Sequence, residues 1–427
     1  MCDNRVDNVF CVVAIIIVLY SLFFIIYRIF NINGFKFKKM HLLTKKESYN
    51  PSKKESFKLF GGVLSFRLLT IILSIIIFMI FFSSNEINIT EAINNWVKWD
   101  ATHYLRIANG YASYIENGLY PTLVFFPLYP MCIAVFKLFF NEVVAGLIVS
   151  NLASSIACVY IYKLVSMDYE KKTALITVIV LNIFPFAFFF SSIMSESIFL
   201  LTSAMSLYYI RKHHWVMAGI TGLLCALSRS LGVFIIIPAI VELIEEYKLI
   251  KNIRDIKYII KTIIKKALPL LLIPFGLAIY LYCNYKVTGD WFYFLKMQKD
   301  IWNQVYTPFY KIFTVNYNTI NQFDTSFVFC ISIPQLIIII ISYFILLFSV
   351  KNNRTMYSIW LLVNIIVNTS MSWPLSVCRY FICTIPLFIF IANYLKRHRY
   401  LFFAYCILSI MLYTIYFIAY LKGINIF

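Results

Sequence analysis

Charged residues are scarce in this chain, and acidic residues are the scarcest. Only 13% of the 427 residues are Asp, Glu, Lys or Arg, and 19 acidic residues stand against 38 basic ones. Soluble globular domains usually carry about 25% charged residues, so this composition excludes a soluble domain. Glycine and proline are also few, at 12 each. Their low number excludes collagen-like and Gly/Pro-rich disordered chains.

The chain is instead rich in apolar residues, which make up 61% of it. Apolar runs of about 20 residues recur along its length, and this is the length that a helix needs to cross a bilayer. Membrane β-barrels are excluded because their strands alternate apolar with polar residues. We therefore expect an all-α, polytopic membrane protein with about twelve transmembrane helices. The expected spans are 9–30, 60–83, 123–140, 143–166, 173–190, 192–210, 215–241, 267–285, 327–350, 356–372, 375–395 and 400–421.

The ten cysteines include no C-x-x-C pair, and most fall inside apolar runs. We interpret them as small buried apolar side chains, not as a disulfide or metal-binding framework. The sequence also contains no P-loop, no G-x-G-x-x-G turn and no His/Cys metal motif. It therefore predicts neither a metal ion nor a cofactor.

The net charge of +19 would suggest nucleic-acid binding in a soluble protein. Here the basic residues lie in short segments between apolar runs, where the positive-inside rule and anionic headgroups explain them. The expected partners are therefore membrane lipids and no nucleic acid. The sequence leaves protein partners open.

Basic segments also predict the orientation of the chain. Segments 31–58 and 245–266 are rich in lysine and are expected in the cytoplasm. Two later basic clusters fall on the same side if every span crosses. The pairs at 171–172 and 211–212 disagree, because the same alternation places them outside. Two long segments, 84–122 and 286–326, are then expected on the non-cytoplasmic side, where we look for chemistry.

The first outer segment contains a cluster of reactive side chains. Asp100 follows Trp99, and His103 and Tyr104 lie one helical turn further on if the stretch is helical. This grouping is typical of a general base held by polar neighbours. The alternative is an interfacial anchor in which Asp100 caps a short helix over 101–109. The residues alone leave both readings open.

Charged residues within apolar runs are costly and usually mark a substrate pathway or a paired partner. Glu196, Arg229 and Arg379 are of this kind. Arg379, near the outer end of its span, suits a phosphate because guanidinium binds it through two parallel hydrogen bonds. The alternative is a structural ion pair, such as Glu196 with Arg229. Arg67 lies near the cytoplasmic end and is expected to snorkel towards water.

The second outer segment begins KVTGDWFYFLKMQKDIWNQ. Its aromatic residues favour a helix that lies in the membrane interface without a catalytic role. Within it, Asp290 and Gln298 are candidates for contacts with sugar hydroxyl groups.

Several motifs resemble one family. The run WDATHYLRIANGY at 99–111, followed by FFPLYP, resembles the first external loop of the PIG-V family of mannosyltransferases, which belongs to the GT-C superfamily. SSIMSESIF, LSRSLG, TGDWFYF with the later Trp302, and CRYFICTIPLF follow in the same order as in that family. The resemblance extends from residue 59 to residue 394.

The resemblance implies a GT-C fold with seven core helices and a sugar donor carried on a polyprenyl phosphate. Asp100 matches the Trp-Asp position of the family and would be the catalytic carboxylate. Eukaryotic members use dolichyl-phosphate-mannose to add the second mannose of the glycosylphosphatidylinositol (GPI) anchor precursor. Residues 1–58, an additional span and a basic loop, depart from the family pattern, so we divide the chain into 1–58 and a glycosyltransferase domain, 59–427.

The functional prediction is an inverting transfer of a hexose, favoured as mannose, to a glycolipid or cell-envelope glycan at the non-cytoplasmic face. Asp100 is the expected base, and Arg379, Arg229 or His103 would neutralise the leaving phosphate. The membrane would be the plasma membrane in a prokaryote and the endoplasmic reticulum in a eukaryote. The alternative is a multi-span transporter or lipid flippase that uses the intramembrane charges, although transporters usually show internal repeats and none is found here.

Overall fold

A computed structural model describes residues 4–35, 49–81, 88–351 and 353–426. Within these ranges every regular element is a helix, and two isolated β-bridges are the only strand-like pairs. The all-α prediction is therefore confirmed. The α-helices are α1 (Asn4–Ile32), α2 (Lys53–Phe81), α3 (Ile89–Asn94), α4 (Asp100–Ile107), α5 (Leu128–Phe136), α6 (Glu142–Ser166), α7 (Lys171–Asn182), α8 (Glu196–Arg211), α9 (Trp215–Ser228), α10 (Ile236–Glu246), α11 (Ile256–Thr262), α12 (Leu272–Thr288), α13 (Tyr293–Asp300), α14 (Ile312–Gln322), α15 (Thr325–Phe327), α16 (Ile333–Ser349), α17 (Thr355–Thr369), α18 (Val377–Phe381), α19 (Ile385–Leu395) and α20 (Arg399–Leu421). The short 3₁₀ and π segments are η1 (Tyr111–Ser113), η2 (Pro121–Val124), η3 (Ala187–Ser191), η4 (Ser230–Ile235), η5 (Ile263–Ala267), η6 (Leu268–Leu271), η7 (Phe309–Lys311) and η8 (Val328–Ser332).

Six described helical stretches are long and apolar enough to cross a membrane, and shorter apolar helices accompany them. The chain is thus an integral membrane protein, while the number of about twelve spans stays a prediction. The six long stretches are Val9–Ile32, Lys53–Phe81, Glu142–Ser166, Ile256–Thr288, Thr325–Ser349 and Arg399–Leu421.

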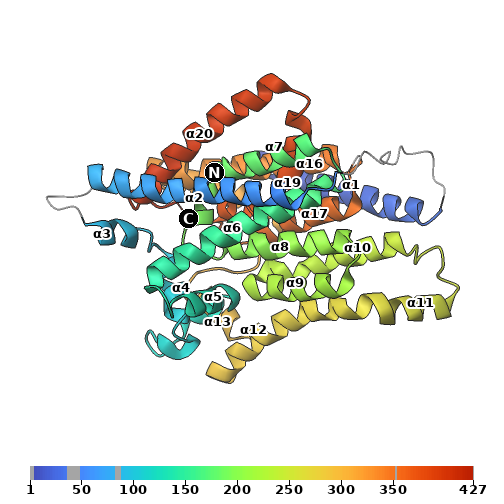
Figure 1. Ribbon diagram of the computed structural model, residues 1–427, viewed down its shortest axis with the longest axis horizontal. Helices are drawn as coiled ribbons and strands as arrows, with labels where there is room; N and C mark the ends of the chain where they lie inside the picture. The colour runs from blue at the N-terminus through green and yellow to red at the C-terminus, as the bar shows by residue number, and fades with distance from the viewer. Residues whose placement is uncertain (1–3, 36–48, 82–87, 352, 427) are drawn as a thin grey trace.

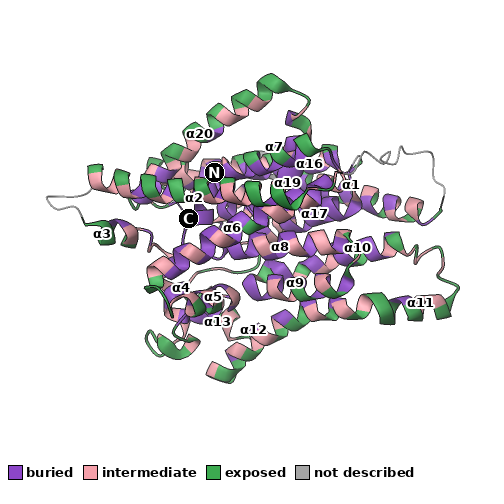
Figure 2. Ribbon diagram, in the orientation of Figure 1, coloured by how far each residue is buried: buried purple, intermediate pink, exposed green. Residues whose placement is uncertain are grey.

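The long helices lie side by side along the long axis of the molecule (Figure 1). Burial is greatest in the central helices and least in the peripheral ones (Figure 2). In an 18-residue apolar stretch of α6, 72% of the residues are buried, whereas in the corresponding stretch of α20 only 11% are buried. The outward faces of α1, α2, α12 and α20 carry exposed apolar side chains, as expected for surfaces that contact lipid.

The segment expected to span at 123–140 forms only the nine-residue helix α5. At 1.5 Å per residue it is about 14 Å long, roughly half of a hydrocarbon core. Pro127 and Pro130 explain its late start, because a helix continuous from residue 123 would need the N–H that each proline lacks. As a helix, this segment is too short to cross.

The segment expected to span at 215–241 is divided at Arg229 into α9 and α10. Arg229 is extended, with φ −159° and ψ 156°. The Trp215 ring N–H donates to the Tyr247 hydroxyl at 3.0 Å, so the start of α9 lies beside the end of α10. The turn needs Gly232, because a Cβ there would lie 2.0 Å from the carbonyl oxygen of Cys225. The two helices therefore form a hairpin.

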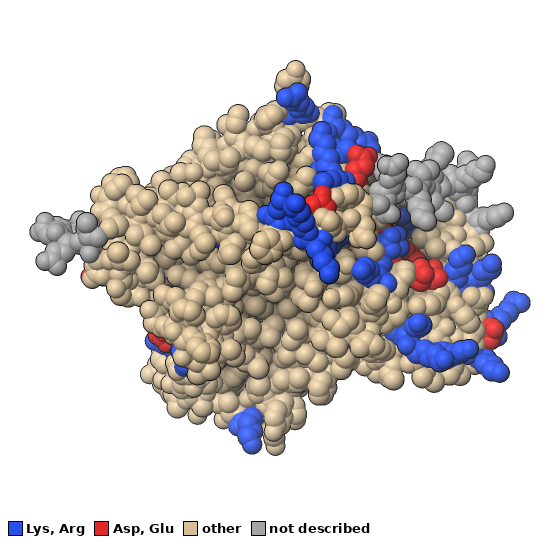
Figure 3. Space-filling view, viewed as in Figure 1, with Lys and Arg blue, Asp and Glu red and all other residues tan. Residues whose placement is uncertain are grey.

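These two differences correct the placement of the basic pairs. Lys171 bonds Glu55 of α2, and Arg211 bonds Asp168 at 2.8 Å. Arg354 lies 3.5 Å from the same aspartate, so these side chains share one end of the molecule. The placement of the pairs at 171–172 and 211–212 on the outer side is therefore wrong. That placement followed from counting 123–140 as a membrane crossing. In Figure 3, which has the orientation of Figure 1, most of the visible Lys and Arg side chains lie at the end of the molecule away from α3 and α4.

This basic end is held by a network of ion pairs, and we call it the inner end. Arg354 bonds Glu242 of α10 at 2.7 Å, and His213 approaches the same carboxylate at 3.0 Å. Arg211 and Asp168 complete the network, which joins the ends of α6, α8, α10 and α17. Of the basic loop expected at 31–58, residues 36–48 lie outside the described part of the chain.

Arg67 does not snorkel towards water, as the sequence suggested. Its side chain is fully buried, where it donates to the carbonyl oxygen of Ala187 at 2.9 Å and to the Asn182 side chain. Ala187 is the first residue of η3, so the arginine adds a side-chain hydrogen bond at the start of this short helix. Arg67 therefore joins α2 to an irregular stretch of backbone.

The shared end of the basic pairs is testable by labelling single cysteines with a membrane-impermeant maleimide in a background without the native cysteines. We expect Lys172→Cys and Lys212→Cys to react from the same side as Lys351→Cys, because their neighbours are joined by ion pairs. Asn117→Cys in the first outer segment should react from the opposite side. Labelling of Lys212→Cys together with Asn117→Cys would contradict the arrangement.

Candidate functional site

Asp100 begins α4, directly after a strained residue. Trp99 has φ 47° and ψ −115°, a conformation that side-chain-bearing residues rarely adopt. Its ring lies 5.4 Å from that of Tyr420 in α20, centroid to centroid. The neighbouring Trp96 is fully buried and donates to the Ser74 hydroxyl at 2.9 Å. These aromatic contacts hold the turn that presents Asp100, and such strain is typical of functional sites.

Asp100 does not cap its helix through its side chain. The N-cap position of α4 belongs to Trp99, and no side-chain hydrogen bond caps this helix. The Asp100 carboxylate instead accepts a hydrogen bond from Nη2 of Arg379 at 2.6 Å. The interpretation of Asp100 as a helix cap is therefore wrong, and this carboxylate has a charged partner from the far end of the sequence.

Glu196 begins α8, after the irregular segment that contains η3. Its side chain is 1% exposed. The Oε1 atom lies 2.8 Å from Nη1 of Arg229 and 2.9 Å from Nε of Arg379. The second distance suits an ion pair, although the N–H is not aligned for a hydrogen bond. One buried carboxylate thus lies between two arginines.

The four side chains form a chain of alternating charge, in the order Asp100, Arg379, Glu196, Arg229. We call it the charged quartet. Its net charge is zero, which suits an apolar interior where an unpaired charge would be very costly. Its two ends are the more accessible, because Asp100 is 23% and Arg229 17% exposed, whereas Arg379 is 6% exposed.

Aromatic and polar side chains enclose the quartet. The guanidinium of Arg229 lies 4.4 Å from the ring centroid of Tyr380, in cation–π geometry. Arg379 donates to the sulfur of Met194 at 3.1 Å. Tyr104 of α4 donates to the hydroxyl of Ser195 at 2.8 Å, which ties α4 to the start of α8. Burial raises the pKa of the Tyr104 hydroxyl, so this group stays a hydrogen-bond donor.

His103 lies on α4 beside the quartet but outside its ion pairs. Its ring centroid is 5.1 Å from that of Phe125 and 5.7 Å from that of Trp302. Its Nδ1 atom is buried without a hydrogen-bond partner. Burial lowers the pKa of His103, because the charged form loses solvation there. A neutral imidazole is therefore favoured at this position.

Asp290 and Gln298 lie on the second outer segment, away from the quartet. Asp290 is exposed and accepts from the backbone N–H of Phe292 within its own turn. Gln298 lies on α13, which contacts η2 of the first outer segment. The two outer segments therefore pack together, but the described contacts of Asp290 and Gln298 do not reach the charged quartet.

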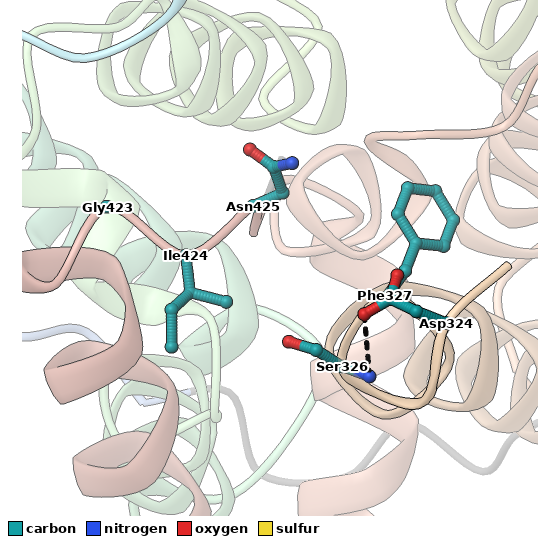
Figure 4. Close-up of a pocket in the computed structure, with 6 residues that line it drawn as sticks. All are labelled: Asp324, Ser326, Phe327, Gly423, Ile424 and Asn425. Carbon is teal, nitrogen blue, oxygen red and sulfur yellow. Dashed lines mark hydrogen bonds between the residues drawn. The ribbon is translucent and has the colours of Figure 1, made fainter.

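A polar pocket of about 280 Å³ lies between the start of α15 and the C-terminal tail (Figure 4). Its carboxylate, Asp324, accepts from the backbone N–H of Ser326 at 3.2 Å. A Cβ on Gly423 would lie 3.7 Å from the ammonium of Lys98, so the pocket adjoins the turn before α4. The lining residues are Asp324, Ser326, Phe327, Gly423, Ile424 and Asn425.

Comparison with known proteins adds independent support for an enzyme. A family model described as dolichyl-phosphate-mannose-protein mannosyltransferase matches residues 127–282. This part of the chain is therefore similar to glycosyltransferases of mannosyltransferase type. It begins just before α5, ends within α12, and includes Glu196 and Arg229. No curated protein and no solved structure matches the chain.

The sequence identified all four members of the charged quartet, and the structure brings them together. The pairing of Glu196 with Arg229, expected as one alternative, is present. Sequence reasoning missed Ser195, Tyr380 and Tyr420, whose only signals were their positions near charged residues or in the last apolar run. Within the described ranges, no group of three or more His, Cys, Asp or Glu side chains has a metal-binding arrangement.

The buried carboxylate of the quartet gives a stability prediction. Replacing Glu196 with Gln removes the negative charge that lies against the buried Arg379 and the half-buried Arg229, which should lower the free energy of unfolding by about 3 kcal/mol or more. Thermal unfolding of the purified protein in detergent measures the change. Glu142→Gln, an exposed acid at the start of α6, is the matched control and should unfold like the wild type. An unchanged Tm for Glu196→Gln would contradict this role.

Proposed function

We propose that this glycosyltransferase transfers mannose from a polyprenyl-phosphate donor to a glycolipid or cell-envelope glycan at the non-cytoplasmic membrane face. The observation that carries the proposal is the Asp100 carboxylate, held by a buried arginine at the start of α4, a helix at the end of the molecule opposite the basic inner end (Figure 1). A family model for enzymes that use a lipid-linked mannose matches the middle of the chain. The PIG-V-like motifs support the same donor.

The proposed reaction is a single inverting displacement. The acceptor oxygen attacks the anomeric carbon while Asp100 takes the hydroxyl proton. A new C–O bond forms as the bond to the phosphate oxygen breaks, and the phosphate departs with that electron pair. No covalent enzyme intermediate is needed, because the donor sugar is already activated. The hydrogen bond from Arg379 supports this role, because it fixes the position of the carboxylate at the start of α4.

The two arginines would divide the work. Arg229 is the more exposed, so it is the better candidate for direct contact with the departing phosphate. Its planar group suits bidentate binding of phosphate oxygens. Arg379 is buried between Asp100 and Glu196, which favours a positioning role over the phosphate contact suggested by its sequence position. Glu196 would in turn orient both arginines.

The remaining candidates would act around this centre. Tyr104 and Trp99 would fix the position of α4, and His103 would contribute a neutral imidazole beside the acceptor path. Asp290 and Gln298 would contact sugar hydroxyl groups from the second outer segment. We propose no metal ion and no cofactor, because a monophosphate leaving group can be neutralised by arginine.

The PIG-V resemblance also suggests an acceptor. In a eukaryotic host it would be the GPI precursor in the endoplasmic reticulum, and in a prokaryote an envelope glycan at the plasma membrane. A transporter or flippase would also use intramembrane charges. The match to a glycosyltransferase model favours the enzyme.

The general base is tested by replacing Asp100 with Asn, which keeps the shape of the side chain and removes its basicity. We expect transfer to fall by about 10²- to 10⁴-fold, the usual contribution of general base catalysis. The measurement is transfer of radiolabelled mannose from polyprenyl-phosphate-mannose to an endogenous lipid extract in membranes. Glu116→Gln removes an exposed carboxylate from the same outer segment and should leave transfer unchanged. Full turnover by Asp100→Asn would end the assignment.

The division between the arginines is tested with two lysine variants. Arg379→Lys should lower kcat by roughly tenfold or more, because one ammonium cannot bond Asp100 and also lie against Glu196. Arg229→Lys should mainly raise KM for the donor, because a compact ammonium replaces a bidentate fork. Steady-state rates at varied donor concentration separate the two effects. The reverse pattern would assign the phosphate contact to Arg379.

A further inference from the structure

A second cavity, unrelated to the charged quartet, opens between α2 and α7. It is a groove of about 280 Å³, and nearly all of its lining is apolar. We call it the α2–α7 groove. Its lining residues are Lys58, Leu59, Gly62, Val63, Phe66, Val178, Ile179, Asn182 and Ile183.

The groove follows from the spacing of the residues on α2. Lys58, Gly62 and Phe66 recur every four residues, so they share one face of the helix. Both α2 and α7 pack against α6. The sides of α2 and α7 that face each other form the walls of the groove. The groove is open beside Gly62, because a Cβ at that position would meet no heavy atom within 4 Å.

The groove lies in the inner half of the membrane. Lys58 is one turn beyond Glu55, which bonds Lys171 at the inner end. Phe66 lies two turns further along α2, about 12 Å at the helical rise. This length fits within one leaflet, whose hydrocarbon is about 15 Å thick. The ring of Phe66 contacts Tyr413 of α20, with centroids 6.3 Å apart, at the outer end of the groove.

The polar group at the deep end of the groove needs no polar ligand. Asn182 is the one polar residue at its deep end, and its amide already donates to the carbonyl oxygen of Val178 at 2.8 Å. The amide oxygen accepts from Arg67. Within a bilayer, an apolar groove of this kind is satisfied by a hydrocarbon chain, which restores the dispersion contacts that a void would lose.

The mouth of the groove is basic. Lys58 lies on the groove itself, and Lys53 and Lys54 precede it on the exposed start of α2. Lys171 and Lys172 begin α7 on the other side. The two acids nearby, Glu55 and Glu170, are each paired with a lysine. The surplus of positive charge favours an anionic headgroup at this membrane surface.

We propose that the α2–α7 groove binds one anionic phospholipid of the inner leaflet. An acyl chain would lie between the two helices, and Lys58 would bind the phosphate from the groove mouth. The proposal does not depend on the transferase reaction. The mannose donor would act at the opposite end of the molecule, near Asp100, so its polyprenyl tail is not the expected occupant.

The test is native mass spectrometry of the purified full-length chain, delipidated and then supplied with dioleoyl-phosphatidylglycerol, dioleoyl-phosphatidylcholine or a polyprenyl phosphate. The wild type should retain one phosphatidylglycerol, roughly fivefold more than phosphatidylcholine. Gly62→Phe fills the groove and should lose this lipid. Gly61→Phe adds the same ring one position away, off the groove face, and should retain it, because its Cβ is equally unhindered. Lys58→Gln should keep a lipid but lose the preference for phosphatidylglycerol.

Four outcomes would overturn the proposal. The first is equal retention of phosphatidylglycerol by Gly62→Phe and the wild type, and the second is an unchanged lipid preference in Lys58→Gln. The third is stronger retention of the polyprenyl phosphate than of phosphatidylglycerol, together with loss of the polyprenyl phosphate in Gly62→Phe. This result would assign the groove to the donor tail. Loss of the lipid in Gly61→Phe as well would point to a general effect on α2 and would also contradict the groove assignment.

Discussion

The outer half of this molecule depends on one buried carboxylate. Glu196 is almost completely enclosed, and it neutralises Arg229 and Arg379 at the same time. Without it, two guanidinium groups would share an apolar interior with only Asp100 as counter-charge, which is strongly unfavourable. Because these residues come from α4, α8, α18 and the turn after α9, their pairing also fixes how four distant parts of the sequence meet.

The interruptions of the helices follow from the same requirement. Glu196 comes directly after an irregular segment, Arg229 lies at the turn between α9 and η4, and Arg379 is on the short helix α18. Irregular backbone is tolerated at membrane depth only where protein buries it or where it lines a cavity. At η3, Arg67 buries its side chain and donates a hydrogen bond to the carbonyl oxygen of Ala187. The breaks are therefore part of how the chain carries charge into its interior.

The sequence predicted the individual charges better than their geometry. Glu196, Arg229 and Arg379 could be predicted as functional candidates because charged residues are rare in apolar runs, and each of the three interrupts such a run. Their grouping was not predictable, because it depends on which helices become neighbours. Apolar length was misleading at 123–140, where prolines delay the start of α5, and at 215–241, where the run hides a hairpin. Hydropathy counts residues without regard to backbone hydrogen bonds, and therefore cannot distinguish a span from two half-length helices.

Burial within the quartet limits how substrates approach. Only its ends, Asp100 and Arg229, retain appreciable exposure, while Arg379 and Glu196 lie beneath them. Under the proposed reaction, an acceptor hydroxyl would meet the carboxylate at one end and a donor phosphate would meet the guanidinium at the other. Arg379 and Glu196 would then link base and phosphate site electrostatically without touching either substrate. Such preorganised charge needs no rearrangement during the reaction, which is the condition under which electrostatic stabilisation of a transition state is most effective.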